Sequence, residues 1–167
     1  MFALNGLAIV AVATVVYEPR STRSISRVLA SHAAPDEPVV FLQEYFFDVA
    51  FYAALRTPAL VVDDWDDPDL SRHDNWRKEL FDARQFASPT ARPVLLLRTD
   101  LARTLCGPTA TWLIGQRRFA ARFPELAGAN EVAAAGEDVL WRVPGRAAAS
   151  LTAGGCPEKP SANSAGK

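Results

Sequence analysis

The densest group of chemically capable side chains is an acidic loop that directly follows the apolar run 60–62. It holds five aspartates within seven residues: Asp63, Asp64, Asp66, Asp67 and Asp69. Like charges this close must be separated, protonated or bridged by a cation, and hard cations such as Mg²⁺ accept carboxylate oxygens. The sequence therefore allows two interpretations, a cation site or a solvated loop whose acids cap the next helix and pair with Arg72, Arg77 and Lys78.

Other patterns that would complete an active site are missing from the sequence. Two histidines, His32 and His73, are too few for a histidine-rich metal site. The acidic loop lacks the glycine and the closing glutamate of an EF-hand, and there is no Gly-x-Ser-x-Gly elbow. We therefore predict no catalytic residues, no bound metal and no cofactor within this chain.

The two cysteines, Cys106 and Cys156, do not amount to a disulfide framework. Cys106 follows Leu101 and Leu105 on a predicted helix, which indicates a buried free thiol. Cys156 lies in a Gly/Pro/Ser-rich stretch and is expected to have no fixed partner.

Length and charge limit the class of protein. The chain has 167 residues, of which 49% are hydrophobic, so we expect one globular domain. A net charge of -1 with scattered basic residues argues against nucleic acid as a partner. Residues 1–17 carry no charge and as a helix would span roughly 25 Å. We interpret them as the end of a transmembrane helix, or the connector leaving it, that runs into the first strand; the alternative is a soluble protein with a central amino-terminal strand.

Hydrophobic runs and turn signals predict an α/β fold with a mainly parallel sheet covered by helices on both faces. Strands are predicted at 39–42, 59–63, 94–97, 111–115 and 139–143. Helices are predicted from 21 or 22 to 33, at 45–55, from 73 or 74 to 86, from 99 or 100 to 105, and at 117–123. The apolar segment is then 1–17, the α/β domain 18–143, and 144–167 a disordered tail, because its Ala, Gly, Ser and Pro cannot bury enough apolar surface.

Aromatic residues cluster at 45–52 and recur at Trp65 and Trp76. Such rings fill cores or stack on sugars. Tyr45, Tyr52 and Trp65 each carry a polar atom and are the better candidates for a ligand-facing or membrane-facing edge.

Several runs of sequence resemble a known family. Residues 41–52 and 58–65, with 74–80 and 139–143, resemble the carboxyl-terminal extracytoplasmic domain of bacterial GT-C membrane glycosyltransferases related to the protein mannosyltransferases and the lipid A aminoarabinose transferases. In that family a multi-helix membrane portion, which holds the catalytic carboxylate, transfers a sugar from a polyprenyl-phosphate donor. This chain contains no such helices, so no catalytic residue can be carried over.

The resemblance implies an accessory domain at the bacterial inner membrane that faces the periplasm and is partnered by the membrane portion of the same enzyme. It would act as a lid or as a docking surface for a glycan, lipid or protein acceptor, with the polyprenyl-phosphate sugar nearby. The implied contributors to substrate binding are Tyr45, Asp48, Tyr52, Asp64, Trp65 and Asn75.

Three observations keep alternatives open. Asp64-Trp65-Asp66 is similar to the Asp-x-Asp element of one class of nucleotide-sugar transferases, which would indicate a self-contained metal-dependent sugar or phosphate enzyme using Asp64 and Asp66. The predicted helices could instead dock on a partner in a non-catalytic interaction domain. Arg20, Arg23 and Arg27 follow the apolar segment, and the positive-inside rule alone would place them in the cytoplasm.

Overall fold

The computed structural model describes residues 21–86 and 93–145. These form a six-stranded mixed sheet with the strand order β3-β2-β1-β4-β6-β5. The strands are β1 (Val39–Leu42), β2 (Leu60–Asp63), β3 (Leu95–Leu97), β4 (Thr111–Gln116), β5 (Asn130–Ala135) and β6 (Asp138–Val143). The helices are α2 (Arg23–His32), α3 (Phe47–Tyr52), α4 (Trp76–Ala83) and α5 (Arg98–Leu105), with 3₁₀ turns at Leu70–Arg72, Arg84–Phe86, Arg117–Arg122 and Pro124–Gly128.

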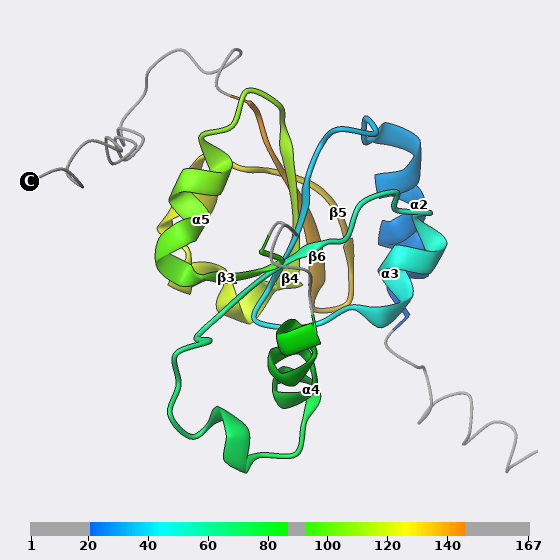
Figure 1. The fold of residues 1–167 in the computed structure, drawn as a ribbon. Coiled ribbons are helices and arrows are strands. Elements are labelled where there is room, and N and C mark those ends of the chain that lie inside the picture. Colours follow the sequence, from blue (N-terminus) through cyan, green and yellow to red (C-terminus); the bar gives the residue numbers. More distant parts are fainter. Residues whose placement is uncertain (1–20, 87–92, 146–167) are drawn as a thin grey trace, which may run out of the picture.

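Four strands are parallel, and the order of their connections reverses at β1. The chain moves outward from β1 through α3 to β2 and through α4 to β3, and α5 then returns it to β4 on the other side of β1. β6 and β5 add antiparallel to β4. Figure 1 shows α2 and α3 on one face of the sheet and α5 on the other. The carboxyl ends of β1 and β4 therefore form a topological switch point, where open α/β sheets bind ligands.

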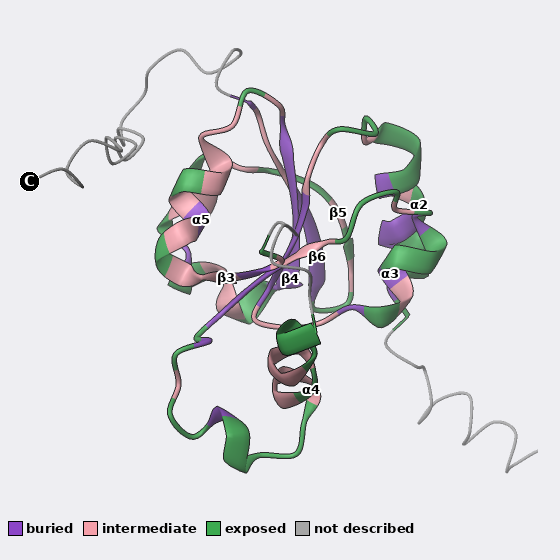
Figure 2. Ribbon diagram, in the orientation of Figure 1, coloured by how far each residue is buried: buried purple, intermediate pink, exposed green. Residues whose placement is uncertain are grey.

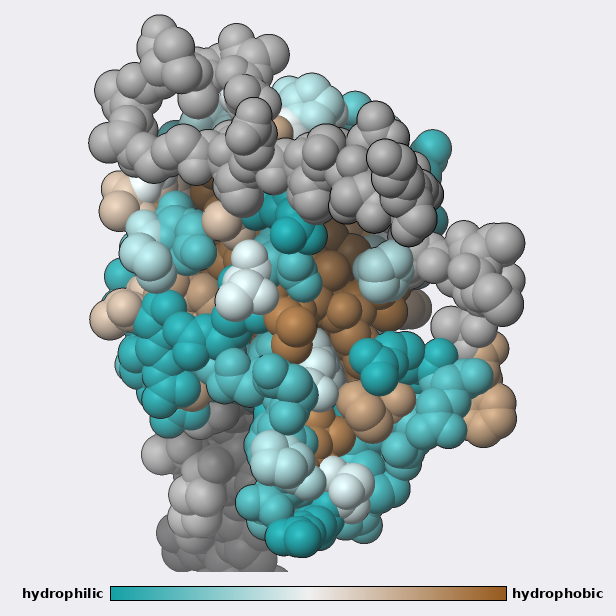
Figure 3. All heavy atoms as spheres, turned by 60° about the vertical axis from the view of Figure 1, so that its left-hand side comes forward, coloured by the Kyte–Doolittle hydropathy of each residue, from teal (hydrophilic) through white to brown (hydrophobic). Residues whose placement is uncertain are grey.

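The two faces of the sheet are buried in separate cores. Side chains alternate along β1, so that Val39 and Phe41 pack with α2, α3 and α4, while Val40 and Leu42 pack with α5 and the 3₁₀ turns Arg117–Arg122 and Pro124–Gly128. Buried residues are concentrated in the strands, and the outer faces of the helices are exposed (Figure 2). Seen from the side that carries α5, apolar residues form an area bordered by hydrophilic ones (Figure 3).

Strands β1 and β4 approach closely at the switch point. Gly115 pairs with Leu42, and a Cβ at Gly115 would lie 2.9 Å from the Leu42 Cβ. The missing side chain lets the two backbones meet where the connections diverge.

The predicted fold class is confirmed, with one strand missed. β5 was not predicted, because its run Asn-Glu-Val-Ala-Ala-Ala is poor in β-branched residues. It is an edge strand whose residues are mostly exposed, so little hydrophobic patterning marks it. The segment predicted at 1–17 lies outside the described residues, as does the tail predicted at 144–167 except for its first two residues.

The prediction for Cys106 is wrong. Cys106 is disulfide-bonded and half-buried at the carboxyl end of α5. Counting cysteines excluded a multi-bridge framework but did not exclude a single bridge, and the residue ends the helix instead of facing the core. The chain's other cysteine, Cys156, lies outside the described residues. Within 21–86 and 93–145, no helix is both long and apolar enough to cross a bilayer.

Candidate functional site

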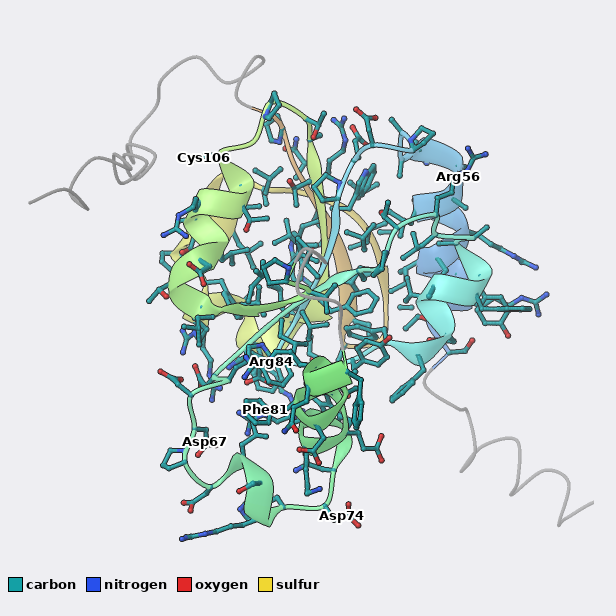
Figure 4. All side chains as sticks on the ribbon, in the orientation of Figure 1. Arg56, Asp67, Asp74, Phe81, Arg84 and Cys106 are labelled. Carbon is teal, nitrogen blue, oxygen red and sulfur yellow. The ribbon has the colours of Figure 1, made fainter. Side chains whose placement is uncertain are left out.

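The residues predicted to do chemistry gather at the carboxyl edge of the sheet. Tyr45 and Asp48 follow β1, Asp64 and Trp65 follow β2, and Asn75 precedes α4. Figure 4 places Asp67 and Asp74 at the same end of the molecule as α4, while Cys106 lies at the opposite end. Five of the six candidates thus lie at this edge, whereas Tyr52 ends α3, and their surroundings differ.

Arg77 of α4 organises the acidic loop. Its Nε lies 3.1 Å from Asp63 Oδ2 and its Nη1 lies 3.3 Å from Asp67 Oδ2. Its Nη2 donates to the Asp64 carbonyl oxygen at 2.8 Å. One guanidinium therefore bridges three residues of the loop, which explains how carboxylates so close in sequence are held together.

The pKa values of Asp63 and Asp67 are shifted in opposite directions. Burial raises the pKa of Asp63 above its ordinary value, although the backbone N–H of Asp64 and the charge of Arg77 oppose that rise. The pKa of Asp67 is lowered, first by the backbone N–H of Asp69 and then by Arg77. Asp63 is thus a buried carboxylate that depends on Arg77, as expected of a structural ion pair.

The loop does not assemble a metal site among the described residues. No group of three or more His, Cys, Asp or Glu side chains there could hold a metal ion. Asp64 and Asp66 are both exposed, whereas Asp63 and Asp67 face Arg77. The loop therefore matches the ion-paired interpretation more closely than the cation-site interpretation.

A pocket of about 220 Å³ lies at the switch point itself, and we call it the polar pocket because hydrogen-bonding side chains line it among aromatic rings. Its lining combines carboxylates, an amide, a hydroxyl and aromatic rings, from Thr22, Glu44, Tyr45, Phe46, Phe47, Asp48, Gln116 and Asp138. Gln116, at the end of β4, donates from Nε2 to Glu44 Oε2 at 2.7 Å across the gap from β1. Such a mixture of hydrogen-bonding groups and rings suits a hydroxyl-rich ligand.

The backbone beside this pocket is held in an uncommon conformation. Gln43, directly after β1, has a φ of 53°, which for a residue other than glycine costs on the order of 1 kcal/mol. Its N–H donates to the Val62 carbonyl oxygen at 2.9 Å, and its Oε1 accepts from Arg122 Nη1 at 3.3 Å. These bonds fix the turn that brings Glu44 and Tyr45 to the pocket.

An apolar groove of about 340 Å³ adjoins the polar pocket. It lies between α3 and α4 over β2 and β3, with Ala50, Leu80, Val61 and Leu95 in its lining. Tyr45 lines both the groove and the polar pocket. Its ring meets Phe41 and Phe47 edge-on, with centroids 5.6 and 4.6 Å away. Of the six candidates, Tyr45 is therefore the one that lines both cavities.

Asp48 and Asn75 have structural partners. Asp48 Oδ1 accepts the Thr22 hydroxyl at 2.6 Å and its Oδ2 accepts the Thr22 N–H at 3.1 Å, which ties α3 to the start of α2. Asn75 Oδ1 accepts the N–H groups of Arg77 at 3.0 Å and Lys78 at 3.3 Å, and so caps α4.

The expectation of a ligand-facing ring is wrong for Trp65. Its side chain is 5% exposed, its Nε1 donates to the Val61 carbonyl oxygen at 3.1 Å, and its ring meets that of Trp76 at 6.1 Å. Burial with a satisfied N–H makes Trp65 a core residue, because the four-residue return to Val61 provides the partner that its polar atom needs. Tyr52, in contrast, is exposed beside Arg23.

Sequence reasoning missed three residues that line the pocket. Glu44, Gln116 and Asp138 are separated by at least twenty residues from one another, and only the sheet brings them together. A signal was present for two of them, because Glu44 and Gln116 sit at the carboxyl ends of predicted strands. Arg77 was expected to pair with the loop, but not to bridge it.

The chain was compared with known proteins. No family model and no curated protein matches it. Similar solved structures include the crystal structure of ArnT from Cupriavidus metallidurans bound to undecaprenyl phosphate, with a TM-score of 0.56 and 14% identity over 83% of this chain and 23% of that chain. The apo ArnT structure gives a TM-score of 0.51 and 16% identity over 74% of this chain and 20% of that chain.

At these identities the likeness establishes the fold alone. This chain spans less than a quarter of the length of ArnT. The described α/β domain accordingly has the fold of one part of that protein.

Proposed function

We propose that this chain provides an accessory extracytoplasmic domain of an integral-membrane glycosyltransferase that uses a polyprenyl-phosphate-linked sugar donor. The domain serves as a lid or an acceptor-docking surface and has no complete active site of its own. The observation that carries the proposal is the fold shared with part of ArnT. One of those ArnT structures holds undecaprenyl phosphate, a lipid of the polyprenyl-phosphate class that the sequence resemblance implies.

The location of Thr22, near the start of the described residues, supports an orientation for the domain. The described chain begins at Ser21, and Thr22 lines the pocket at the carboxyl edge. The uncharged apolar run 1–17 precedes it by only a few residues. In the proposed enzyme the carboxyl edge, with its pocket and acidic loop, faces the membrane portion.

The disulfide supports an extracytoplasmic location. Disulfides persist in oxidising compartments such as the bacterial periplasm and are rare in the cytosol. The bridge made by Cys106 therefore fits a domain on the periplasmic side of the inner membrane.

The surface around Tyr45 supports acceptor docking. Tyr45 lines both a pocket that contains carboxylate, amide and hydroxyl groups and a neighbouring apolar groove. An acceptor with a hydroxyl-rich part and an apolar part would contact both. The metal-dependent alternative gains no such support, because Asp64 and Asp66 are exposed and belong to no group of three or more possible metal ligands among the described residues.

The experiment compares the isolated chain with the assembly found in native membranes. The 167-residue chain incubated with an undecaprenyl-phosphate-linked sugar and membrane-extracted acceptors is expected to transfer no more sugar than a chain-free control. Membranes that contain the chain together with its multi-helix partner should transfer sugar. Removal of the α/β domain should slow that transfer on the order of 10²-fold, the scale of lost substrate positioning.

Two results would overturn the proposal. Efficient transfer by the isolated chain would make it a self-contained enzyme. Unchanged transfer by membranes that lack the domain would show that it neither closes over the site nor docks the acceptor.

A further inference from the structure

The side of the domain formed by α2 and α3 carries an unusual group of exposed aromatic rings. Phe47 is 66% exposed, Phe51 81% and Tyr52 38%. Phe47 and Phe51 are four residues apart and share one face of α3, and the Phe51 and Tyr52 rings are 5.4 Å apart. Apolar rings that are exposed together, instead of singly, indicate an interaction surface.

Arg23 of α2 borders these rings. The Arg23 guanidinium lies 5.5 Å from the centroid of the Tyr52 ring. Arg27, one turn later, is exposed. Figure 1 shows α2 and α3 side by side. We call the group Arg23, Arg27, Phe47, Phe51 and Tyr52 the aromatic–arginine surface.

Acidic side chains are few along α2 and α3 themselves, whereas Phe47 at the start of α3 shares the polar pocket with Glu44 and Asp138. No Asp or Glu occurs between residues 21 and 35, and Asp48 alone occurs between 45 and 62. The Asp48 carboxylate is engaged by Thr22. The part of the surface that Arg23 and Arg27 form beside Tyr52 is therefore positive and complementary to an anionic partner.

The surface also lies where the described chain begins. Thr22 is bound to Asp48 at the start of α3, one residue from Phe47 and one residue from Arg23. The uncharged run 1–17 ends a few residues earlier, and its length and composition suit burial in a bilayer. A segment anchored there would hold this corner of the domain close to lipid head groups.

We propose that the aromatic–arginine surface rests on the anionic lipid surface of the membrane. The rings enter the head-group region, as tyrosines and other aromatic residues do at membrane interfaces, and Arg23 and Arg27 pair with lipid phosphates. This contact fixes the tilt of the domain, and with it the position of the carboxyl-edge pocket above the bilayer. Arg23 and Arg27, which the positive-inside rule alone would place in the cytoplasm, thereby bind lipid phosphates on the extracytoplasmic side. The proposal rests on the membrane attachment in the proposed function.

The experiment uses lipid photocrosslinking with the full chain in vesicles. Phe51 is replaced by p-benzoylphenylalanine, and the matched control carries the same residue at Phe86, which is 90% exposed in the 3₁₀ turn after α4. The vesicles contain phosphatidylcholine with alkyne-tagged phosphatidylglycerol. The label at position 51 is expected to capture tagged lipid several-fold more than the label at position 86. The double variant Arg23→Glu, Arg27→Glu should lower that capture by about fivefold for each arginine.

The outcomes separate this proposal from the proposed function. Equal lipid capture at positions 51 and 86 by a chain that floats with vesicles overturns the surface contact and leaves membrane attachment intact. A chain that does not float with vesicles at all contradicts both. Crosslinks from position 51 to a second copy of the chain, in place of lipid, would identify a dimer interface and overturn the lipid contact. Circular dichroism of the arginine variant checks that its fold is retained.

Discussion

Glu37 shows how one carboxylate can join separate parts of the fold. Its Oε2 accepts the Trp112 indole N–H at 2.6 Å and the Ala34 N–H at 3.1 Å, while its Oε1 accepts Arg142 Nη2 at 2.7 Å. Burial alone would raise the pKa of Glu37, but the hydrogen bonds from Trp112, Arg142 and Ala34 outweigh it and lower the pKa below its usual 4.5. The loop before β1 is thereby tied to β4 and β6.

Glu37→Gln is expected to destabilise the domain at neutral pH by about 1–3 kcal/mol, because an amide N–H₂ would face a donor where an oxygen now accepts. A lowered folded pKa means that the stabilisation is complete above the ordinary pKa and is lost as the pH falls through the folded value. The difference between variant and parent should therefore shrink in acid. Urea unfolding at neutral and acidic pH measures it, with the exposed Asp36→Asn as control. A difference that is independent of pH would contradict the role of the charged form.

Trp65→Ala tests whether this ring belongs to the core. Deletion of a buried aromatic side chain costs about 3–5 kcal/mol, and Trp65 is 5% exposed. The matched control Phe51→Ala removes a ring that is 81% exposed and should change stability by no more than about 0.5 kcal/mol. Thermal unfolding of both variants measures the difference. Similar unfolding midpoints for the two would contradict the core role and favour a ligand-facing Trp65.

At the scale of elements, α4 and the acidic loop form one unit through Arg77. The side chain of Asp63 is 8% exposed and that of Arg77 is 23% exposed. Removing one partner from a buried ion pair leaves an uncompensated charge, whereas removing both can be nearly neutral. The loss of either Asp63 or Arg77 alone should therefore destabilise this unit more than the loss of both.

Arg77→Met is expected to destabilise the domain by about 3 kcal/mol at neutral pH. The pKa of Asp63 is already raised by burial, and the loss of Arg77 raises it further. Above that pKa the unpaired carboxylate must be buried, whereas in acid it is protonated and the penalty falls. Denaturant unfolding across this pH range should show the loss of stability growing as the pH rises. The double variant Asp63→Asn, Arg77→Met should recover most of it, and a double variant no more stable than Arg77→Met would contradict the pairing.

The elements themselves were largely predictable, and the exceptions have physical reasons. The helices and five of the strands follow from apolar runs between Pro, Gly and Asp signals, since local periodicity reports which face is buried. β5 carries little such signal, because an exposed edge strand buries few side chains. Trp65 was predicted to face a ligand because a tryptophan suits both a buried core and an amphipathic edge. Only its hydrogen bond to the Val61 carbonyl oxygen distinguishes the two.

At the scale of the whole molecule, the site is a consequence of strand order. Gln116 and Glu44 are seventy-two residues apart and meet because β4 pairs with β1. Local sequence patterns predict a strand but not its neighbours, so the pocket could not be assembled from them. The sequence did indicate the carboxyl edge of the sheet, because residues that follow parallel strands share one end of the sheet.

Tyr45→Phe in the intact membrane enzyme tests whether that pocket binds the acceptor. The change removes one hydroxyl and keeps the ring contacts with Phe41 and Phe47, so stability should be nearly unchanged. The loss of one hydrogen bond to a hydroxyl-rich acceptor should raise KM about fivefold and leave kcat unaltered, since that contact is made equally in the ground and transition states. Tyr52→Phe, the matched control outside the pocket, should leave both parameters unchanged. A higher KM in the control but not in Tyr45→Phe would move acceptor docking from the switch point to the outer face of α3.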